Sequence, residues 1–175
     1  MTDPVSEAVA HYPLSHPLRV RWAEVDAQQV VFNGHYLMYA DVCCTEYFRA
    51  AGVAQWTGPA TSGPATPGPA TSGAATPGTG EPGEENADEV LDYYVVRATL
   101  DYKASARFDD LLTLRGRISR LGNSSFTFEC RIEREGVWLC TAEVTSVNAF
   151  AGASRPLPAH FRAAVSAFEA QSGPS

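Results

Sequence analysis

The sequence has no long apolar run. None of its apolar stretches approaches the roughly 20 residues that a helix needs to cross a bilayer. The N-terminal stretch also lacks the basic start and the apolar centre of a secretory signal. We therefore expect a cytoplasmic protein with no membrane span.

Cysteine is scarce and poorly spaced for a metal site. The four cysteines contain no C-x-x-C pair, so we expect small buried thiols rather than a zinc site or a disulfide framework. The sequence also has no G-x-S-x-G, H-E-x-x-H or P-loop motif, which argues against a serine-hydrolase elbow, a zinc peptidase and a nucleotide-phosphate loop. We expect no metal and no cofactor.

Basic residues are in the minority. The chain has 13 Lys and Arg against 20 Asp and Glu, for a formal net charge of -7. An acidic surface repels phosphate backbones, so nucleic acid is not an expected partner. With 45% hydrophobic residues in 175, the composition predicts one globular domain with a substantial core.

Residues 57–80 contain no large apolar side chain at all, only Thr, Gly, Pro, Ala and Ser. A unit of ten residues, TSGPATPGPA at 61–70, recurs as TSGAATPGTG at 71–80 with seven of ten positions matching. Stacked copies of this unit have nothing to bury, so we predict a disordered insertion at about 57–88 within the single domain. Its glycines Gly78, Gly80 and Gly83 fit G-x-G-x-x-G, but no strand precedes them and no helical pattern follows.

Before the insertion, the pattern predicts one strand and one helix. Leu18–Val25 alternates, with Leu18, Val20 and Trp22 on the inner face. Tyr36–Ala51 has helical spacing, with Asn33 or Gly34 as the expected N-cap. Its apolar surface is wide, which predicts packing neighbours on several sides.

After the insertion, the chain reads almost entirely as strand. Four strands are predicted, at Leu91–Tyr102, Leu111–Leu121, Ser125–Arg134 and Val137–Phe150. Tight turns are expected at Gly122-Asn123 and Glu135-Gly136, and a short helix at Ala159–Ala170. Strands joined by short turns form an antiparallel meander. The prediction is an α+β fold with a five-stranded antiparallel sheet wrapped around a central helix.

Asp26 is the residue whose position suggests chemistry. It stands at the predicted strand end, seven residues before Asn33 at the predicted helix start. A carboxylate there can act as a nucleophile or as a general base for water. The unpaired amides of a helix N-terminus can hold a developing oxyanion. From spacing alone, a turn-forming or capping role for Asp26 remains open.

Two separated stretches carry a family resemblance. VRWAEVDAQQVVFNGHYL, followed by TEYFR, resembles the signature V-R-[YFW]-x-[DE]-x-D-x-x-G-[VH]-V-[FY]-[NH]-x-x-Y-[LV] and helix T-E-Y-[LFW]-R of hotdog-fold acyl-CoA thioesterases of the 4-hydroxybenzoyl-CoA thioesterase type. DYKASARFDDLLTLRGRISRLGNSSFTFECRI, after the insertion, resembles the strand and turn patterns of the same family. Gln29 departs from the signature, since it stands where a glycine is common.

The resemblance implies a hotdog fold and hydrolysis of an acyl-CoA to a free acid and CoA. It implies that Asp26 is the catalytic carboxylate, as nucleophile or general base, and that the backbone amide of Asn33 donates to the oxyanion, with help from Gly34. It also implies a homodimer or homotetramer. Val31, Tyr36 and Tyr39 are expected to line the acyl pocket. Expected contacts to CoA include Arg107, Ser124 and Ser125, with Lys103, Arg120, Asn123 and Arg155 as further candidates.

Other residues and functions remain open alternatives. Glu46 on the helix is the rival catalytic group, although an ion pair with Arg49 or Arg107 is the simpler expectation. His35, one position past the matching site, is expected at the rim. Two rival functions remain. One is a hotdog dehydratase or hydratase, and the other is a non-catalytic hotdog module with an acyl-CoA-binding or regulatory role.

The insertion is expected to be dispensable for folding, because it has no apolar groups to pack and a long flexible loop costs little more to close than a short one. Replacing Thr57–Glu85 with a short Gly/Ser linker should leave the melting temperature nearly unchanged in a thermal melt. A fall of more than a few degrees would show that the segment packs on the domain.

Overall fold

The computed structural model describes residues 11–53, 91–150 and 152–170. The predicted insertion at 57–88 lies outside the described residues. In chain order the elements are β1 (Leu14–Arg19), a 3-10 turn (Trp22–Glu24), α1 (Asn33–Ala50), β2 (Tyr93–Tyr102), β3 (Leu111–Leu121), β4 (Ser125–Arg134), β5 (Val137–Phe150), β6 (Ala153–Ser154) and α2 (Ala159–Ala170). No helix among these ranges is long and apolar enough to cross a membrane.

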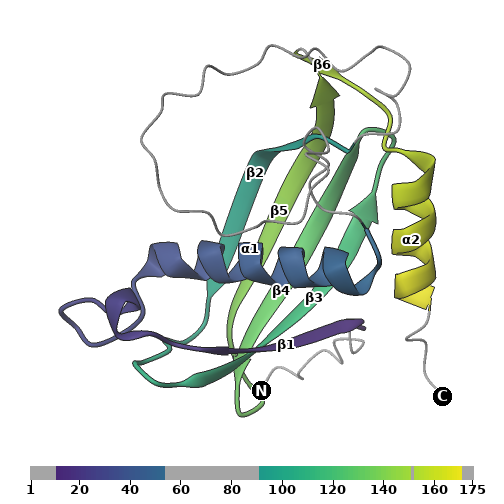
Figure 1. Cartoon of the computed structure of the whole chain (residues 1–175). Coiled ribbons are helices and arrows are strands. Elements are labelled where there is room, and N and C mark those ends of the chain that lie inside the picture. The colour runs from purple at the N-terminus through teal and green to yellow at the C-terminus, as the bar shows by residue number, and fades with distance from the viewer. Residues whose placement is uncertain (1–10, 54–90, 151, 171–175) are drawn as a thin grey trace, which may run out of the picture.

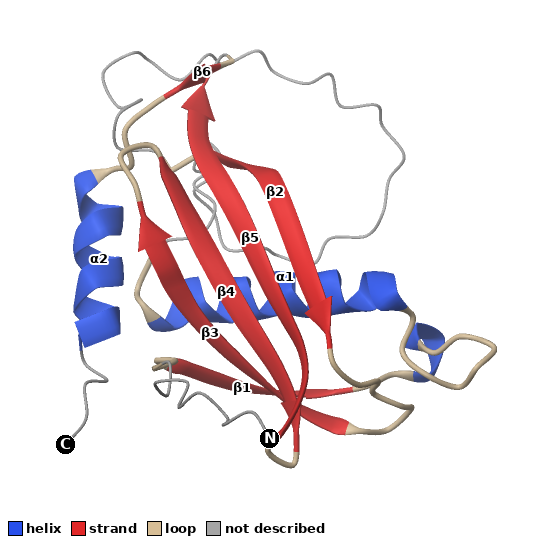
Figure 2. Cartoon of the chain, turned by 180° about the vertical axis from the view of Figure 1, so that it is seen from behind, coloured by secondary structure: helices blue, strands red, loops and turns tan. Residues whose placement is uncertain are grey.

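The sheet lies behind one long helix. Its strands run in the order β1-β3-β4-β5-β2, all neighbours are antiparallel, and the two-residue β6 adds to β5. Figure 1 shows α1 crossing the sheet, and Figure 2 shows the strands from the opposite side. This confirms the predicted five-stranded antiparallel sheet around a central helix, with β6 as a small addition.

The meander after the insertion was predicted well because its turns have unambiguous chemistry. The bounds of β3, β4 and β5 agree with the prediction, and β2 begins two residues later than expected. Glu135 and Gly136 both have positive φ, at 50° and 78°, as the first and second residues of a tight hairpin turn require. At the other turn, the Gly122 N–H donates to the Ser125 carbonyl at 2.7 Å.

Register shifts bend the sheet around the helix. The extra residues are Ser119 in β3, Val96 in β2, and Leu139 in β5, which lies opposite the Ile132–Glu133 step of β4. A β-bulge places an extra residue in one strand, which bends that strand and increases its twist. Three bulges in three different strands therefore provide the curvature that covers α1.

The first strand was predicted wrongly. β1 ends at Arg19, and Trp22, expected on the inner face, is 73% exposed. The register explains this, because Arg19 pairs with Leu111, which is the first residue of β3. Val20 still bonds to Asp109 and Asp110 through its backbone, and the chain then enters the 3-10 turn. The true strand starts earlier and includes Pro17, which an edge strand tolerates.

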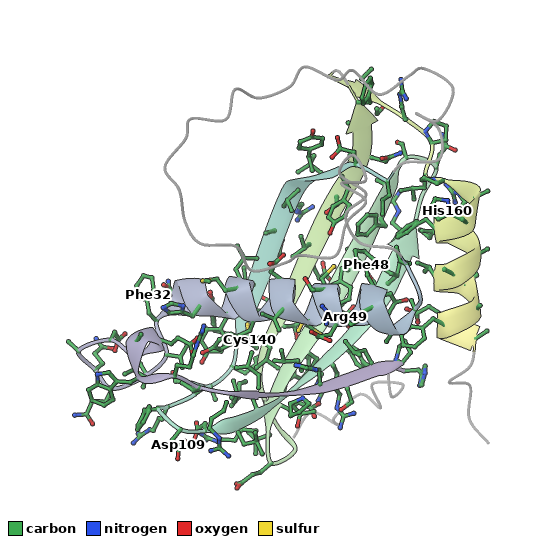
Figure 3. The ribbon with its side chains drawn as sticks, in the orientation of Figure 1. Phe32, Phe48, Arg49, Asp109, Cys140 and His160 are labelled. Carbon is green, nitrogen blue, oxygen red and sulfur yellow. The ribbon has the colours of Figure 1, made fainter. Side chains whose placement is uncertain are left out.

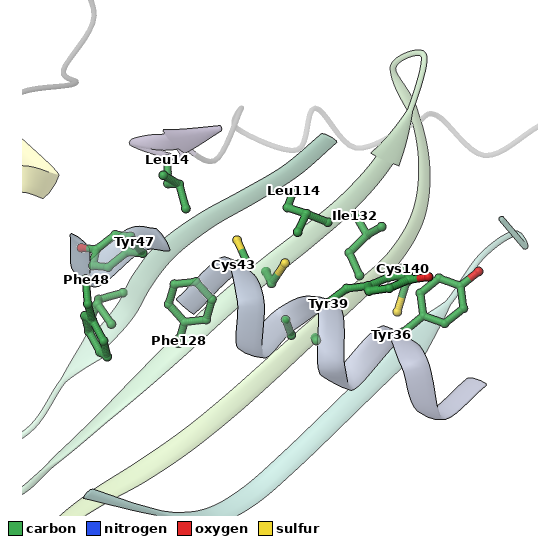
Figure 4. Close-up of a cluster of buried hydrophobic side chains, with 14 of the residues drawn as sticks. Leu14, Tyr36, Tyr39, Cys43, Tyr47, Phe48, Leu114, Phe128, Ile132 and Cys140 are labelled. Atoms are coloured by element: carbon green, nitrogen blue, oxygen red, sulfur yellow. The ribbon is translucent and has the colours of Figure 1, made fainter. Parts of the chain in front are cut away.

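Helix α1 supplies the core with one buried face. It begins three residues before the predicted start and ends at Ala50, and its N-cap is Phe32 instead of Asn33 or Gly34. Its buried side chains point into the concave face of the sheet (Figure 4) and are Tyr36, Tyr39, Ala40, Cys43, Tyr47 and Phe48. Leu37, Met38 and Val42 are 37–55% exposed, so the expected neighbours on several sides are absent from the described part of a single chain.

Gly116 allows the closest approach between helix and sheet. It lies on the inner face of β3 between the buried Leu114 and Ile118. A Cβ at this position would lie 2.8 Å from Cζ of Phe128 and 2.9 Å from Sγ of Cys43. Any side chain here would push the sheet away from α1.

The C-terminal end of α1 is closed by aromatic packing with α2. The rings of Phe48, Phe126 and Phe161 lie 5.3–5.7 Å apart between centroids. Glu169 of α2 accepts hydrogen bonds from the Tyr47 hydroxyl at 2.6 Å and from the Ile118 N–H at 2.7 Å. The chain leaves α1 and returns to β2 at this same end, since the Val53 N–H donates to the Phe48 carbonyl and Tyr93 packs on the Phe48 ring at 5.9 Å.

The convex face of the sheet carries a set of ion pairs. Glu133 is paired with Arg115 and Arg131, each at 2.9 Å, and Glu129 is paired with Arg117 at 2.8 Å. Both glutamates are less than 10% exposed. All four cysteines are free, three of them buried and Cys44 half-buried, as expected for small structural thiols.

Gly116→Ala tests the close approach of α1 to the sheet. The added methyl group meets a ring and a buried sulfur, so the free energy of unfolding should fall by about 1–3 kcal/mol, as is usual for overpacked cores. Denaturant unfolding would measure this. Ser119→Ala on the same strand is the control, because it removes only a 3.3 Å hydrogen bond at an exposed position. Equal stability of Gly116→Ala and wild type would contradict the packing described here.

Candidate active site

A cavity of about 440 Å³ lies at the N-terminal end of α1. Three segments far apart in the sequence form it: the loop before α1, the first turn of α1, and the chain that follows β2. Its lining residues are Asp26, Gln28, Val30, Val31, Phe32, Asn33, Tyr36, Tyr102, Lys103, Ala104 and Ser105. In Figure 3, Phe32 marks this end of α1 and Phe48 marks the opposite, aromatic end.

Asp26 lies at the base of a tight loop. Its N–H donates to the Val30 carbonyl at 2.9 Å, and its own carbonyl accepts the Gln29 N–H at 2.9 Å. One carboxylate oxygen, Oδ1, accepts the Gln28 N–H at 2.8 Å. The Val25–Val31 bridge closes the loop below these bonds. The loop thus orients the Asp26 carboxylate and leaves its second oxygen free of these contacts.

Gln29 has an unusual backbone conformation in this loop. Its φ is 62°, in the left-handed region. A residue other than glycine costs about 1–2 kcal/mol there. The family signature has a glycine at this position, so the departure noted in the sequence changes the side chain and keeps the turn.

The first turn of α1 borders the cavity and has no side-chain cap. Phe32, the N-cap, makes no side-chain hydrogen bond to the amides of this turn. The first amides of a helix have no acceptor within the helix, and they carry the positive end of its dipole. The Asn33 carbonyl accepts the Tyr102 hydroxyl at 3.0 Å, which ties the helix start to the end of β2.

The cavity wall is fixed by hydrogen bonds through Ala106. Its N–H donates to the Tyr36 hydroxyl at 2.8 Å, and its carbonyl accepts the Val31 N–H at 2.9 Å. Tyr36 is 2% exposed and packs on the Tyr102 ring at 5.4 Å. Burial raises the pKa of the Tyr36 hydroxyl, which therefore stays protonated at neutral pH.

The structure brings five predicted site residues together and separates the others. The residues that line one cavity are Asp26, Val31, Asn33, Tyr36 and Lys103. Gly34, Tyr39 and Arg107 do not line it; Gly34 is the next residue of α1 and Arg107 lies exposed in the loop after β2. Ser124 and Ser125 lie at the turn that follows β3. The cavity is near the opposite end of β3, at Leu111, and the ten residues from Leu111 to Leu121 span about 33 Å.

The rival carboxylate lies far from the cavity. Glu46 is 13 residues beyond Asn33 on α1, which corresponds to about 20 Å along the helix. It forms the expected ion pair with Arg49, and that hydrogen bond holds the Glu46 pKa below its ordinary value. His35 does not line the cavity either, although its Nδ1 is buried without a partner among the described residues.

Sequence reasoning missed Glu24 and underrated Tyr102. Glu24 is 3% exposed and accepts hydrogen bonds from the Arg21 N–H and the Tyr39 hydroxyl. The signal was available in the R-x-x-E spacing, because Glu24 caps the turn that Arg21 opens. Tyr102 ends a strand in the second matching stretch, and only the fold brings it to Asn33.

Metal ligation has no support in the described ranges. No group of three or more His, Cys, Asp or Glu side chains in residues 11–53, 91–150 and 152–170 is arranged to hold an ion. The cavity instead combines one carboxylate, free helix amides, tyrosines and Lys103.

Comparison with known proteins places this architecture in a family. The model of the thioesterase superfamily matches residues 28–141, which is more than half of the chain. The matched range covers Asn33 and the second motif stretch, and it begins two residues after Asp26.

Individual relatives are distant and share the fold. The acyl-CoA thioesterase YbgC of Haemophilus influenzae is 26% identical over 143 residues, covering 82% of this chain and 85% of that protein. A 1,4-dihydroxy-2-naphthoyl-CoA thioesterase from Synechocystis superimposes with a TM-score of 0.62 at 16% identity, covering 90% of this chain and 96% of the other. A probable thioesterase from Bartonella henselae gives 0.60 at 23% identity, covering 85% and 100%.

The family match spans both sides of the insertion, and the solved neighbours repeat the sheet and central helix. The chain therefore belongs to the thioesterase superfamily and is a thioester hydrolase built on the hotdog fold.

Proposed function

We propose that the chain hydrolyses an acyl-CoA thioester to a free carboxylic acid and CoA, with Asp26 as the catalytic carboxylate. The observation that carries this proposal is that the Asp26 side chain and the Asn33 end of α1 line the same cavity. The names of the relatives from H. influenzae and Synechocystis support CoA as the thiol part of the substrate.

Each part of the cavity has a role in this chemistry. The Asn33 amide, with no side-chain cap, donates to the thioester carbonyl and stabilises its developing negative charge. Asp26 either attacks the carbonyl carbon, forming an anhydride and releasing CoA, or removes a proton from a water that attacks it. On both routes the C–S bond breaks, the thiolate takes a proton, and one water is consumed overall. Val31 and Tyr36 line the acyl side of the cavity.

Contacts to the CoA phosphates are proposed at two places. Arg107 is exposed in the loop that forms the cavity wall, so its guanidinium is available to phosphate. Ser124 and Ser125 lie at the other end of the sheet, and within one protomer they are too distant to share a substrate with Asp26. We propose that they contact CoA from a second protomer.

A homodimer, alone or paired into a tetramer, is the proposed assembly. β2 is an edge strand, and its residues Tyr94, Val95 and Val96 are 57–61% exposed. Exposed apolar edge strands invite pairing with another strand. The cavity residues Tyr102 to Ser105 directly continue β2, so a partner on this edge borders the cavity.

Asp26→Asn tests the catalytic assignment. The amide keeps the size of the side chain and removes its charge and basicity, so kcat should fall by roughly two to four orders of magnitude. KM should change little, because CoA is held mainly elsewhere. Thiol release from a panel of acyl-CoA substrates measures both constants.

Glu46→Gln is the matched control, since it neutralises a carboxylate on α1 that does not line the cavity, and it should leave kcat near wild type. An active Asp26→Asn with an inactive Glu46→Gln would move catalysis to the helix. If wild type releases no thiol from any acyl-CoA, the non-catalytic binding module replaces the proposal, and hydration of an enoyl-CoA would identify the hydratase alternative.

The dimer is tested by a charge on the edge strand. Val96→Lys should shift the protein from dimer or tetramer to monomer in light scattering, and should lower activity along with it. Val137→Lys is the control, because Val137 is 54% exposed but is the first residue of β5, next to the hairpin turn and away from the β2 edge. An active, stable wild-type monomer would refute the assembly.

A further inference from the structure

Glu24 is a buried carboxylate next to the proposed catalytic residue. It is 3% exposed and stands two residues before Asp26, but it does not line the cavity. Burying a charged carboxylate is costly unless it is paired and hydrogen-bonded. Packing alone therefore does not explain why a carboxylate occupies this position.

The side chain of Glu24 joins two elements. Oε2 accepts the Arg21 N–H at 2.7 Å and the Tyr39 hydroxyl at 2.8 Å, while Oε1 accepts Arg21 Nε at 2.7 Å. Arg21 follows β1, and Tyr39 lies in the second turn of α1. Burial raises the Glu24 pKa, but the hydrogen bonds from Arg21 and Tyr39 outweigh it, so the pKa is lower than usual and the group is anionic at neutral pH.

The backbone of Glu24 makes a further connection. Its carbonyl accepts the N–H of Phe32, the N-cap of α1, at 2.9 Å. Phe32 directly precedes Asn33, whose amide is the proposed oxyanion donor. Glu24 is therefore connected to both ends of the 25–32 loop. It precedes Val25 in the chain, and its carbonyl is hydrogen-bonded to Phe32 at the other end.

We propose that Glu24 is a positioning residue for thioester hydrolysis: through Tyr39 and Phe32 it fixes the Asp26 carboxylate relative to the Asn33 amide. The inference rests on the proposed roles of Asp26 and Asn33. An error of about 1 Å between reacting groups can cost on the order of a hundredfold in rate. A clamp that holds both groups in one frame thus acts on kcat without touching the substrate.

Two variants break the clamp to different extents. Glu24→Gln is nearly isosteric but turns an NH₂ group toward donors, so one of the bonds from Arg21 or Tyr39 is lost. Tyr39→Phe removes only the bond to α1 and keeps the buried ring, which makes it the variant less prone to misfolding. We expect kcat per folded molecule to fall roughly tenfold or more for Glu24→Gln and several-fold for Tyr39→Phe, with KM almost unchanged.

Glu133→Gln is the matched control for the loss of a buried ion pair. Glu133 is 7% exposed and paired with Arg115 and Arg131 on the convex face of the sheet, away from the cavity. Its neutralisation should lower the melting temperature and leave kcat intact. If Glu24→Gln and Tyr39→Phe also keep a wild-type kcat below their melting temperatures, Glu24 is only structural and the inference is wrong.

The double variant Asp26→Asn/Glu24→Gln separates positioning from other effects. If Glu24 acts only by positioning Asp26, it has no effect once the Asp26 carboxylate is replaced. The kcat of the double variant should therefore lie within about threefold of that of Asp26→Asn alone. Losses that multiply would overturn the inference. An inactive Asp26→Asn beside a normal Glu24→Gln would refute the inference alone, whereas an active Asp26→Asn would refute the proposed catalytic assignment together with it.

Discussion

The packing of α1 into the concave face of the sheet is the constraint on which the rest of the structure depends. One helix of 18 residues buries a stripe of aromatic and small side chains, and a flat sheet cannot cover that stripe along its whole length. The bulges in β2, β3 and β5 provide the curvature, and the missing side chain at Gly116 provides the close approach. Burial of apolar area therefore fixes the path of the helix across the sheet.

The two ends of α1 have different surroundings. At the C-terminal end, α2 and the rings around Phe48 seal the core, and Glu169 satisfies the polar groups left inside. At the N-terminal end the sheet no longer covers α1, so the first turn and the Asp26 loop enclose a cavity. The cavity thus lies at the end of α1 that the sheet does not cover. The amides of the first helical turn at this end have no side-chain cap.

Much of the fold was readable from the sequence, and the errors have physical causes. β3, β4 and β5 were predicted correctly because alternation and turn residues agree there. β1 was misplaced because Trp22 continues an alternating pattern that the sheet has no strand left to pair with. Of the site, Asp26, Asn33, Val31 and Tyr36 came from one contiguous motif. The positions of Tyr102 and Glu24 in the site depend on contacts with residues distant in the sequence or buried. Hydrophobic periodicity does not predict such contacts.

The points at which the chain leaves and re-enters the core have an evolutionary consequence. Val53 and Tyr93 both attach beside Phe48, at the sealed end of a helix about 27 Å long whose other end borders the cavity. The two attachment points of the connecting segment are thereby separated from the cavity by the length of α1. Gain or loss of repeat units at 61–80 by replication slippage would leave both attachment points in place, at the end of α1 farthest from Asn33.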